Sequence, residues 1–293
     1  MNKNVYEIIK EKEIHPNFYA KSGNVYIIGD KKEKYALKLK TNNYDIYKYL
    51  ISRDFVHFPE NLSNKIDNYD LSKFILDQDI PEEERLHDYI EILAILHHKT
   101  GYKRQIDLDE IKKDYEKMDN EIKDASKYYY DFNEMADKET FFSPSHYLLV
   151  RNISLFYNLL NYGKKTLDSW YINILKEKSI DVSLIHNNPN INHLLVSDNR
   201  YLISCDKSCF DNPINDIEKF FRKYYHTFSL EMVLDWYTHI NKINKLNLDL
   251  LLIHLAIPKI ISFSSNEYEN TKLVSKEITF LKKIHEYVVK RVK

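Results

Sequence analysis

Residues 183–220 read SLIHNNPNINHLLVSDNRYLISCDKSCFDNPINDIEKF. A short apolar run ends at His186, a polar loop follows, and Leu-Leu-Val then leads to a turn at Asp198-Asn199. A further apolar run ends shortly before Asp206. Short apolar runs between turn residues predict strands. Two strands around a polar loop, with an acid at the end, indicate the floor of an active site, yet residues 187–193 contain no carboxylate.

A β-hairpin is predicted upstream, where residues 24–40 read NVYIIGDKKEKYALKLK. Val25–Ile28 is strand-like, Gly29-Asp30 and the following lysines indicate a turn, and the second strand carries Lys38. An isolated lysine on an edge strand is usually solvated, so Lys38 becomes a candidate site residue only through the order of elements around it.

The clearest helix is predicted at DIPEEERLHDYIEILAILHHKTG, residues 79–101. Pro81 and the glutamates after it suit a helix start, and Gly101 suits a helix end. Apolar residues at helical spacing form one face of this helix. The remaining expected elements are a helix over 43–52, a strand over 71–76, helices over 107–178 with a break near Ser143-Pro144, and helices from 214 to the end.

This pattern predicts an α+β protein with a small β-rich N-terminal part and a large, mostly helical remainder. We expect a two-lobed fold. Its N-lobe would comprise residues 1–78, a sheet plus one helix. Its helical C-lobe would comprise residues 79–293 and carry the loop of 183–207. A chain of 293 residues is long enough for two such lobes with a sizeable core.

Composition excludes several classes of function. Lys plus Arg is 43 and Asp plus Glu is 44, so the formal net charge of −1 predicts no bulk attraction to nucleic acid. Glycine is rare, and neither a P-loop nor a dinucleotide fingerprint occurs. The two cysteines exclude a disulfide framework, and no apolar run predicts a membrane span or a signal peptide. A cytoplasmic protein is the simplest interpretation.

The order of elements resembles the protein-kinase-like fold, specifically its aminoglycoside phosphotransferase branch. Within that branch the chain resembles most the bacterial spore-coat kinase-like proteins of the CotS type. The resemblance covers nearly the whole chain: residues 141–170 look like the family's helical insert, and 212–221 look like the segment after the catalytic loop. It implies an ATP- and Mg²⁺-dependent phosphotransferase site.

The family pattern is His-Gly-Asp, four residues, Asn, then apolar residues ending in Ile-Asp and an aromatic residue. By this resemblance His186 is a structural histidine, and Asn187 replaces the glycine. Asn188 falls on the catalytic aspartate, His193 on the metal-binding asparagine, and Asp206 on the second metal ligand.

Three further positions follow from the same resemblance. Lys38 falls on the strand lysine that contacts nucleotide phosphates, and Asp216 falls on the aspartate that caps the next helix. The helix acid that pairs with the strand lysine has no clear equivalent, and Asn43 and Asp45 are the nearest positions.

The substitutions in the loop favour a protein without activity. An amide at Asn188 has no basicity to accept a hydroxyl proton. His193 suits softer metals, whereas Mg²⁺ prefers oxygen ligands. Lys38 and Asp206 would still suit a nucleotide with one metal ion. The spacing of Cys205 and Cys209 is not typical of zinc sites.

Three hypotheses remain open. The first is a non-catalytic scaffold or assembly factor whose partners are other proteins, which by family analogy lie in the spore coat. The second is a phosphotransferase, acting on a small molecule or a protein, that uses Asp206, Asp211 or Asp216 as a replacement base. The third is a nucleotide-sensing module that binds ATP without turnover.

Overall fold

The computed structural model describes residues 9–10, 17–23, 25–29, 33–39, 44–60, 62, 69–138 and 140–292, without the side chains of 22, 44, 45 and 292. The chain divides into two compact units. The first comprises Met1–Thr100 and His186–Cys209, and the second comprises Gly101–Ile185 and Phe210–Lys293. The predicted catalytic loop therefore belongs to the same unit as the N-terminal sheet. The lobe boundary after residue 78 stays a prediction.

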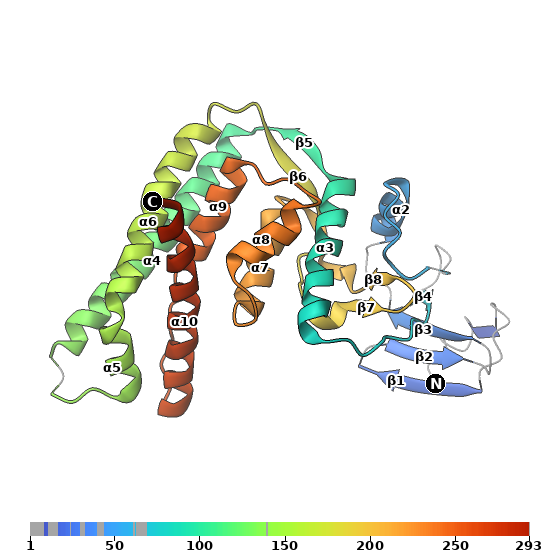
Figure 1. Cartoon of the computed structure of the whole chain (residues 1–293), viewed down its shortest axis with the longest axis horizontal. Coiled ribbons are helices and arrows are strands. Elements are labelled where there is room, and N and C mark those ends of the chain that lie inside the picture. Colours follow the sequence, from blue (N-terminus) through green and yellow to red (C-terminus); the bar gives the residue numbers. More distant parts are fainter. Residues whose placement is uncertain are drawn as a thin grey trace. The chain divides into compact units, whose positions relative to one another are not determined.

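The first unit contains a four-stranded antiparallel sheet in the order β1-β2-β3-β4 (Figure 1). The hairpin predicted from the sequence is confirmed, with Val25 opposite Lys38, although residues 30–32 of its turn lie outside the described chain. The strand expected at 71–76 begins and ends earlier, because the chain leaves the sheet after Lys73 and Leu76 is exposed. The strands are β1 (Phe18–Ser22), β2 (Val25–Gly29), β3 (Lys34–Leu39) and β4 (Tyr69–Lys73).

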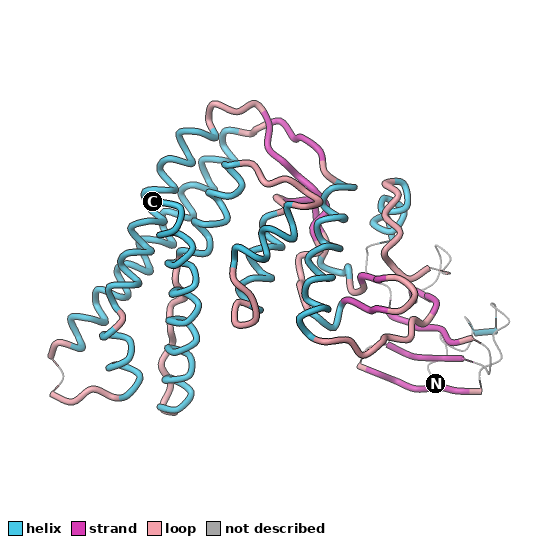
Figure 2. The backbone as a smooth tube through the Cα atoms, viewed as in Figure 1, coloured by secondary structure: helices cyan, strands magenta, loops and turns pink. Residues whose placement is uncertain are grey.

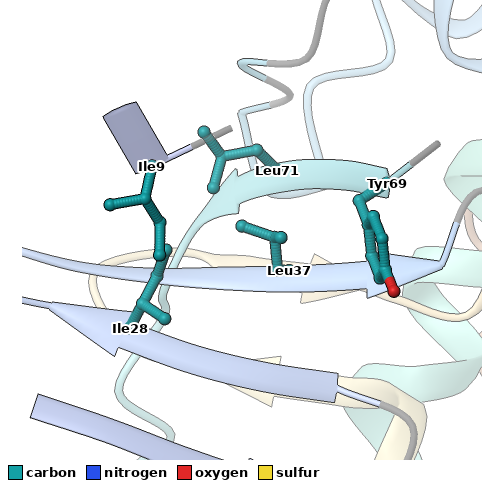
Figure 3. Close-up of a cluster of buried hydrophobic side chains, with 5 residues drawn as sticks. All are labelled: Ile9, Ile28, Leu37, Tyr69 and Leu71. Carbon is teal, nitrogen blue, oxygen red and sulfur yellow. The ribbon is translucent and has the colours of Figure 1, made fainter. Parts of the chain in front are cut away.

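One face of this sheet carries a small apolar core, drawn in Figure 3. Leu37 of β3 lies opposite Leu71 of β4 in the sheet register, and Ile28, Tyr69 and Ile9 complete the cluster. Successive side chains in a strand point to opposite faces. Because Leu37 is buried on this face, the side chain of the next residue along β3, Lys38, points to the other face.

Two helices complete the upstream part of the first unit. The helix predicted over 43–52 is confirmed as α2 (Tyr44–Ser52). The predicted long helix is confirmed as α3 (Glu82–Thr100), which carries glutamates in its first turn. The apolar face expected on this helix is buried, as shown by Leu86, Ile90, Leu93 and Leu96.

The loop region of the first unit forms short elements around a two-stranded ribbon. A 3₁₀ turn, η1 (Ile191–His193), leads into β7 (Leu194–Val196), which pairs with β8 (Arg200–Leu202). A second 3₁₀ turn, η2 (Cys205–Lys207), follows. The strands and the turn at Asp198-Asn199 are thus confirmed.

The second unit is mostly helical, as the cyan tube in Figure 2 shows. Two of its long helices, α4 and α6, lie side by side (Figure 1). The break predicted near Ser143-Pro144 is confirmed, since Ser143 caps the N-terminus of α5. The helices are α4 (Leu108–Ala136), α5 (Pro144–Arg151), α6 (Ile153–Ile174), α7 (Ile214–Tyr224), α8 (Leu230–Thr238), α9 (Lys245–Ala256) and α10 (Glu267–Val292).

A three-stranded sheet in the order β5-β6-β9 completes the fold. Its strands are β5 (Tyr102–Gln105), β6 (Ser179–Ile185) and β9 (Cys209–Asp211), of which β5 and β9 were not expected from the sequence. The predicted α+β class, with a small antiparallel sheet and a helical lobe, is confirmed. Across the described residues, no helix combines the length and the apolar character that crossing a membrane requires.

Candidate functional site

Lys38 and Asp206 form an ion pair between β3 and η2, far apart in the sequence. The Lys38 ammonium group donates a hydrogen bond to Oδ2 of Asp206. Both side chains keep roughly a third of their surface exposed, 31% and 34% respectively. The structure thus brings together the predicted phosphate-binding lysine and the predicted metal-binding aspartate, on the sheet face opposite the apolar cluster.

The helix α2 contributes a tyrosine to the surroundings of this pair. Burial raises the pKa of the Tyr47 hydroxyl far above its ordinary value, and Cys205, Asp70 and Asp206 add to the shift. Tyr47 therefore stays protonated beside a group of acidic side chains. The two positions nearest to the expected helix acid cannot be compared with it, because Asn43 and the side chain of Asp45 lie outside the described part.

His186 is a fully buried structural residue at the start of the loop. Its Nε2 lies 3.0 Å from the carbonyl oxygen of Ile203, which can only accept, so Nε2 carries the proton. The neutral ring then accepts a hydrogen bond at Nδ1 from the Tyr89 hydroxyl, over 3.1 Å. These bonds tie the loop to α3 and to the segment after β8.

Asn187 adopts a backbone conformation that usually favours glycine. Its φ of 61° lies in the left-handed region, which asparagine tolerates better than most residues. Its side-chain Nδ2 donates to the carbonyl oxygen of Lys207 over 3.0 Å and lies 3.5 Å from Sγ of Cys209. Asparagine thus meets the conformational demand of the family's glycine position and also holds the turn that carries Asp206.

The ring of His193 is directed at the loop backbone. Its Nδ1 lies 3.0 Å from the carbonyl oxygen of Asn188 and must donate to it, because a carbonyl only accepts. The same ring packs edge-on against His186, with centroids 5.5 Å apart. One ring nitrogen of His193 is therefore committed to holding the loop rather than to binding a ligand.

Carboxylates are scarce in the loop of 186–209. Asp206 is paired with Lys38, and Asp198 lies in the β7–β8 turn, where it accepts a hydrogen bond from the Tyr201 hydroxyl over 3.0 Å. The position expected for the catalytic base, Asn188, carries a neutral amide. Lys38 and Asp206 together would therefore suit a phosphate and a metal ion, whereas the amide of Asn188 offers no base for proton transfer.

Asp216 belongs to the second unit, where it is fully buried in the first turn of α7. It does not occupy the N-cap position, which is Pro213, and the backbone N–H of Ile214 donates to Oδ1 of Asn212 instead. An acid in the first turn still favours the helix through its dipole. A structural role for Asp216 at this helix stays a prediction.

Two arginines that the sequence pattern did not single out fix the loop region of the first unit. Arg85 of α3 donates through Nη1 to both carboxylate oxygens of Asp77, each at 2.9 Å, and to the carbonyl oxygen of Leu194 at 2.8 Å. Arg200 of β8 bonds to Asp88 at 2.8 Å and to Glu91 at 2.5 Å. Arginine carries five N–H donors in a fixed planar arrangement, which suits such multiple contacts better than lysine. The presence of arginine rather than lysine at these two positions was the one feature of the sequence that could have indicated these contacts.

A possible metal-binding group lies on α3, but its carboxylates are already paired with an arginine side chain. Ligand atoms of His87, Asp88 and Glu91 lie within 4.8 Å of one another. The carboxylates of Asp88 and Glu91 both form ion pairs with the guanidinium of Arg200. An ion there would have to displace this arginine, so we assign the group a structural role.

By sequence alone the chain matches no protein-family model and no curated protein. Solved structures with a similar fold do exist. An aminoglycoside phosphotransferase from Alicyclobacillus acidocaldarius has a TM-score of 0.66 and 12% identity, covering 93% of this chain and 92% of its own. A choline kinase from Streptococcus pneumoniae has a TM-score of 0.50 and 13% identity, covering 98% of this chain and 99% of its own.

At such low identity these likenesses show the fold alone. They extend over nearly the full length of each chain, as expected from the sequence. The chain has the protein-kinase-like fold found in aminoglycoside phosphotransferases and choline kinases.

Proposed function

We propose that this chain is a kinase-like protein without phosphotransferase activity, which acts as a scaffold or assembly factor. The observation that supports the proposal is the hydrogen bond between His193 and the carbonyl oxygen of Asn188. Through this bond His193, which falls on a predicted metal-ligand position, holds the loop instead. The side-chain amide of Asn188 supplies no base. Hydrogen bonds from Asn187 and His193 hold the loop around these residues, which fits a structural role.

The residues at the site fit part of what ATP and Mg²⁺ require. The Lys38 ammonium would contact nucleotide phosphates, and the Asp206 carboxylate would hold one Mg²⁺. His193 does not fit as a second oxygen ligand. A bound nucleotide with its metal would supply a transferable phosphoryl group, whereas this chain's own residues would position it and would not activate an acceptor.

Two alternatives rest on the Lys38–Asp206 pair and on the phosphotransferases of the same fold. One is an active phosphotransferase that recruits Asp206, Asp211 or Asp216 as its base. The other is a nucleotide-sensing module. We also propose a location in the spore coat, which rests only on the resemblance to the spore-coat kinase-like proteins. Cell fractionation of the source organism would test this location.

Phosphate release from ATP with Mg²⁺ tests the proposal against the active enzyme. We expect the wild-type chain, Asp206→Asn and the control Asp198→Asn all to match a protein-free blank. Metal-dependent release by the wild type and by the control, but not by Asp206→Asn, would support the active phosphotransferase instead.

Calorimetric titration with ATP, with and without Mg²⁺, separates the sensing module from a pure scaffold. Metal-dependent binding that Lys38→Met and Asp206→Asn both abolish would indicate nucleotide sensing. Absence of binding up to millimolar ATP would leave the kinase-like shell as a surface for protein partners.

A further inference from the structure

A cavity of about 600 Å³ lies wholly within the second unit. It is lined by the end of α7, by Lys259 after α9, and by one stretch of α10 that includes Lys276. None of its lining residues belongs to the candidate site described above. Its volume lies in the range of sites that take small organic molecules.

Cationic side chains dominate the lining of this cavity. Lys223, Lys259, Lys276 and Arg222 line it, and Glu277 is the one acid among its described lining residues. Within the described chain, no carboxylate lies at ion-pair distance from Lys259 or Lys276. The lining therefore carries an excess of positive charge that suits an anion.

Arg222 contributes a buried donor group that lacks an acceptor. Its Nε pairs with Glu218, and its Nη2 donates to backbone carbonyls, including that of Ile257 at 3.2 Å. Its Nη1 is buried, and no described residue accepts a hydrogen bond from it. Buried donors in folded proteins nearly always have acceptors. The group thus points to an acceptor outside the chain, such as an anion or water.

The cavity wall is held by contacts between α7 and α10. The Tyr225 hydroxyl donates to the carbonyl oxygen of Lys276 over 3.0 Å, and the Tyr225 and Phe280 rings lie 5.4 Å apart. The Arg222 guanidinium stacks over the Phe280 ring at 4.9 Å. These contacts fix the guanidinium before any ligand arrives, which reduces the ordering cost of binding.

Two sources of repulsion on an anion in this cavity are reduced: the carbonyl oxygens at the end of α7 and the carboxyl group of Glu277. Lys283 donates to the carbonyl oxygen of Tyr225, the C-cap of α7, and to that of Phe228, which satisfies an acceptor at the negative end of the α7 dipole. Glu277 is buried and accepts a hydrogen bond from the Lys259 backbone N–H over 2.8 Å. Burial raises the pKa of the Glu277 carboxyl.

We propose that this cavity binds a small organic molecule that carries phosphate, with Lys259, Lys276 and Arg222 as its phosphate contacts. Arginine and lysine are the residues that proteins use most for phosphate. Phe280 and Leu273 provide an apolar wall for the organic part of such a ligand. The inference goes beyond the proposed function and does not depend on it.

Inorganic pyrophosphate serves as the probe in calorimetric titrations of the full chain. We expect the double variant Lys259→Gln/Lys276→Gln to bind pyrophosphate at least about tenfold more weakly than the wild type. The control Lys272→Gln/Lys282→Gln removes the same charge from exposed positions on α10 outside the lining. It should bind within about twofold of the wild type.

Equal weakening in both double variants would overturn the proposal, because it would indicate general attraction to a charged helix. Absence of binding by the wild type at millimolar pyrophosphate would also overturn it. Citrate binding as tight as that of pyrophosphate would overturn the preference for phosphate. Circular dichroism of each variant confirms that it is folded.

Two further measurements locate the bound probe. Pyrophosphate should protect Lys259 and Lys276, but not Lys272 and Lys282, from acetylation detected by mass spectrometry. Lys38→Met should keep pyrophosphate binding, since it alters only the candidate nucleotide site. Protection confined to Lys38, or loss of binding in Lys38→Met, would contradict the proposed cavity and leave the proposed function intact.

Discussion

Lys38 of β3 and Asp206 of η2 hold each other in an ion pair, although 168 positions separate them in the sequence. Each belongs to a segment fixed by other contacts: Lys38 by the register of β3 with β4, and Asp206 by the turn that Asn187 holds. The pair joins the two residues that the sequence predicts to contact a nucleotide phosphate and a metal ion.

This pair should contribute little to stability, because both side chains remain about one-third exposed. A double-mutant cycle with Lys38→Met and Asp206→Asn in urea unfolding should give a coupling free energy of about 0.2–1 kcal/mol. A much larger coupling energy would show that the pair is a structural element of the fold rather than the remains of a ligand site.

The buried contact between Tyr89 and His186 should matter more for stability. Tyr89→Phe removes the donor to Nδ1 and should lower the free energy of unfolding by about 1 kcal/mol. His186→Leu also leaves the Ile203 carbonyl without its donor, so we expect a loss of about 1–3 kcal/mol. Urea unfolding measures both variants.

Tyr201→Phe is the matched control for that measurement, since it removes an exposed tyrosine hydrogen bond to Asp198. Its effect should stay below about 0.5 kcal/mol. If Tyr89→Phe had no larger effect than this control, the structural role assigned to His186 would be wrong.

A carboxylate on α10 should make stability depend on pH. Glu267 accepts a hydrogen bond from the backbone N–H of Ser145 over 2.6 Å, which with further bonds lowers the pKa of its carboxyl from 4.5 to about 2. A lowered pKa in the folded state means that the contribution is complete above about pH 4.5. It is lost as the pH falls towards about 2.

Glu267→Gln should therefore flatten the dependence of the urea midpoint on pH between about 4.5 and 2. Glu286→Gln, which changes an exposed residue of the same helix, should leave the wild-type slope. Identical slopes for wild type and Glu267→Gln would mean that the contact with Ser145 does not persist in solution.

Much of the fold could be predicted because its elements carry strong local patterns. The hairpin of β2 and β3 has strand-like apolar and aromatic residues on both sides of a turn. The helix α3 has acidic residues at its start and one apolar face. The strand β5, by contrast, reads Tyr-Lys-Arg-Gln and is exposed throughout. Its pairing with β6 depends on distant residues, so no local pattern indicates it.

The site was predictable only in part, for a similar reason. The residue types at Asn188 and His193 can be read from the sequence itself, and they predict a site without the usual base. The direction of the His193 ring did not follow from the sequence, because it depends on a backbone carbonyl in the folded loop. The contacts of Arg85 and Arg200 likewise exist only once α3 lies against the β7–β8 ribbon.

Phosphate release from ATP with Mg²⁺ by the wild type and by Asn188→Asp/His193→Asn would show whether the native loop is inactive. The control Asn190→Asp adds a carboxylate to the same loop outside the catalytic position. We expect release above the blank by Asn188→Asp/His193→Asn only. Release by the wild type as fast as by this double variant would contradict the claim that the native loop is inactive.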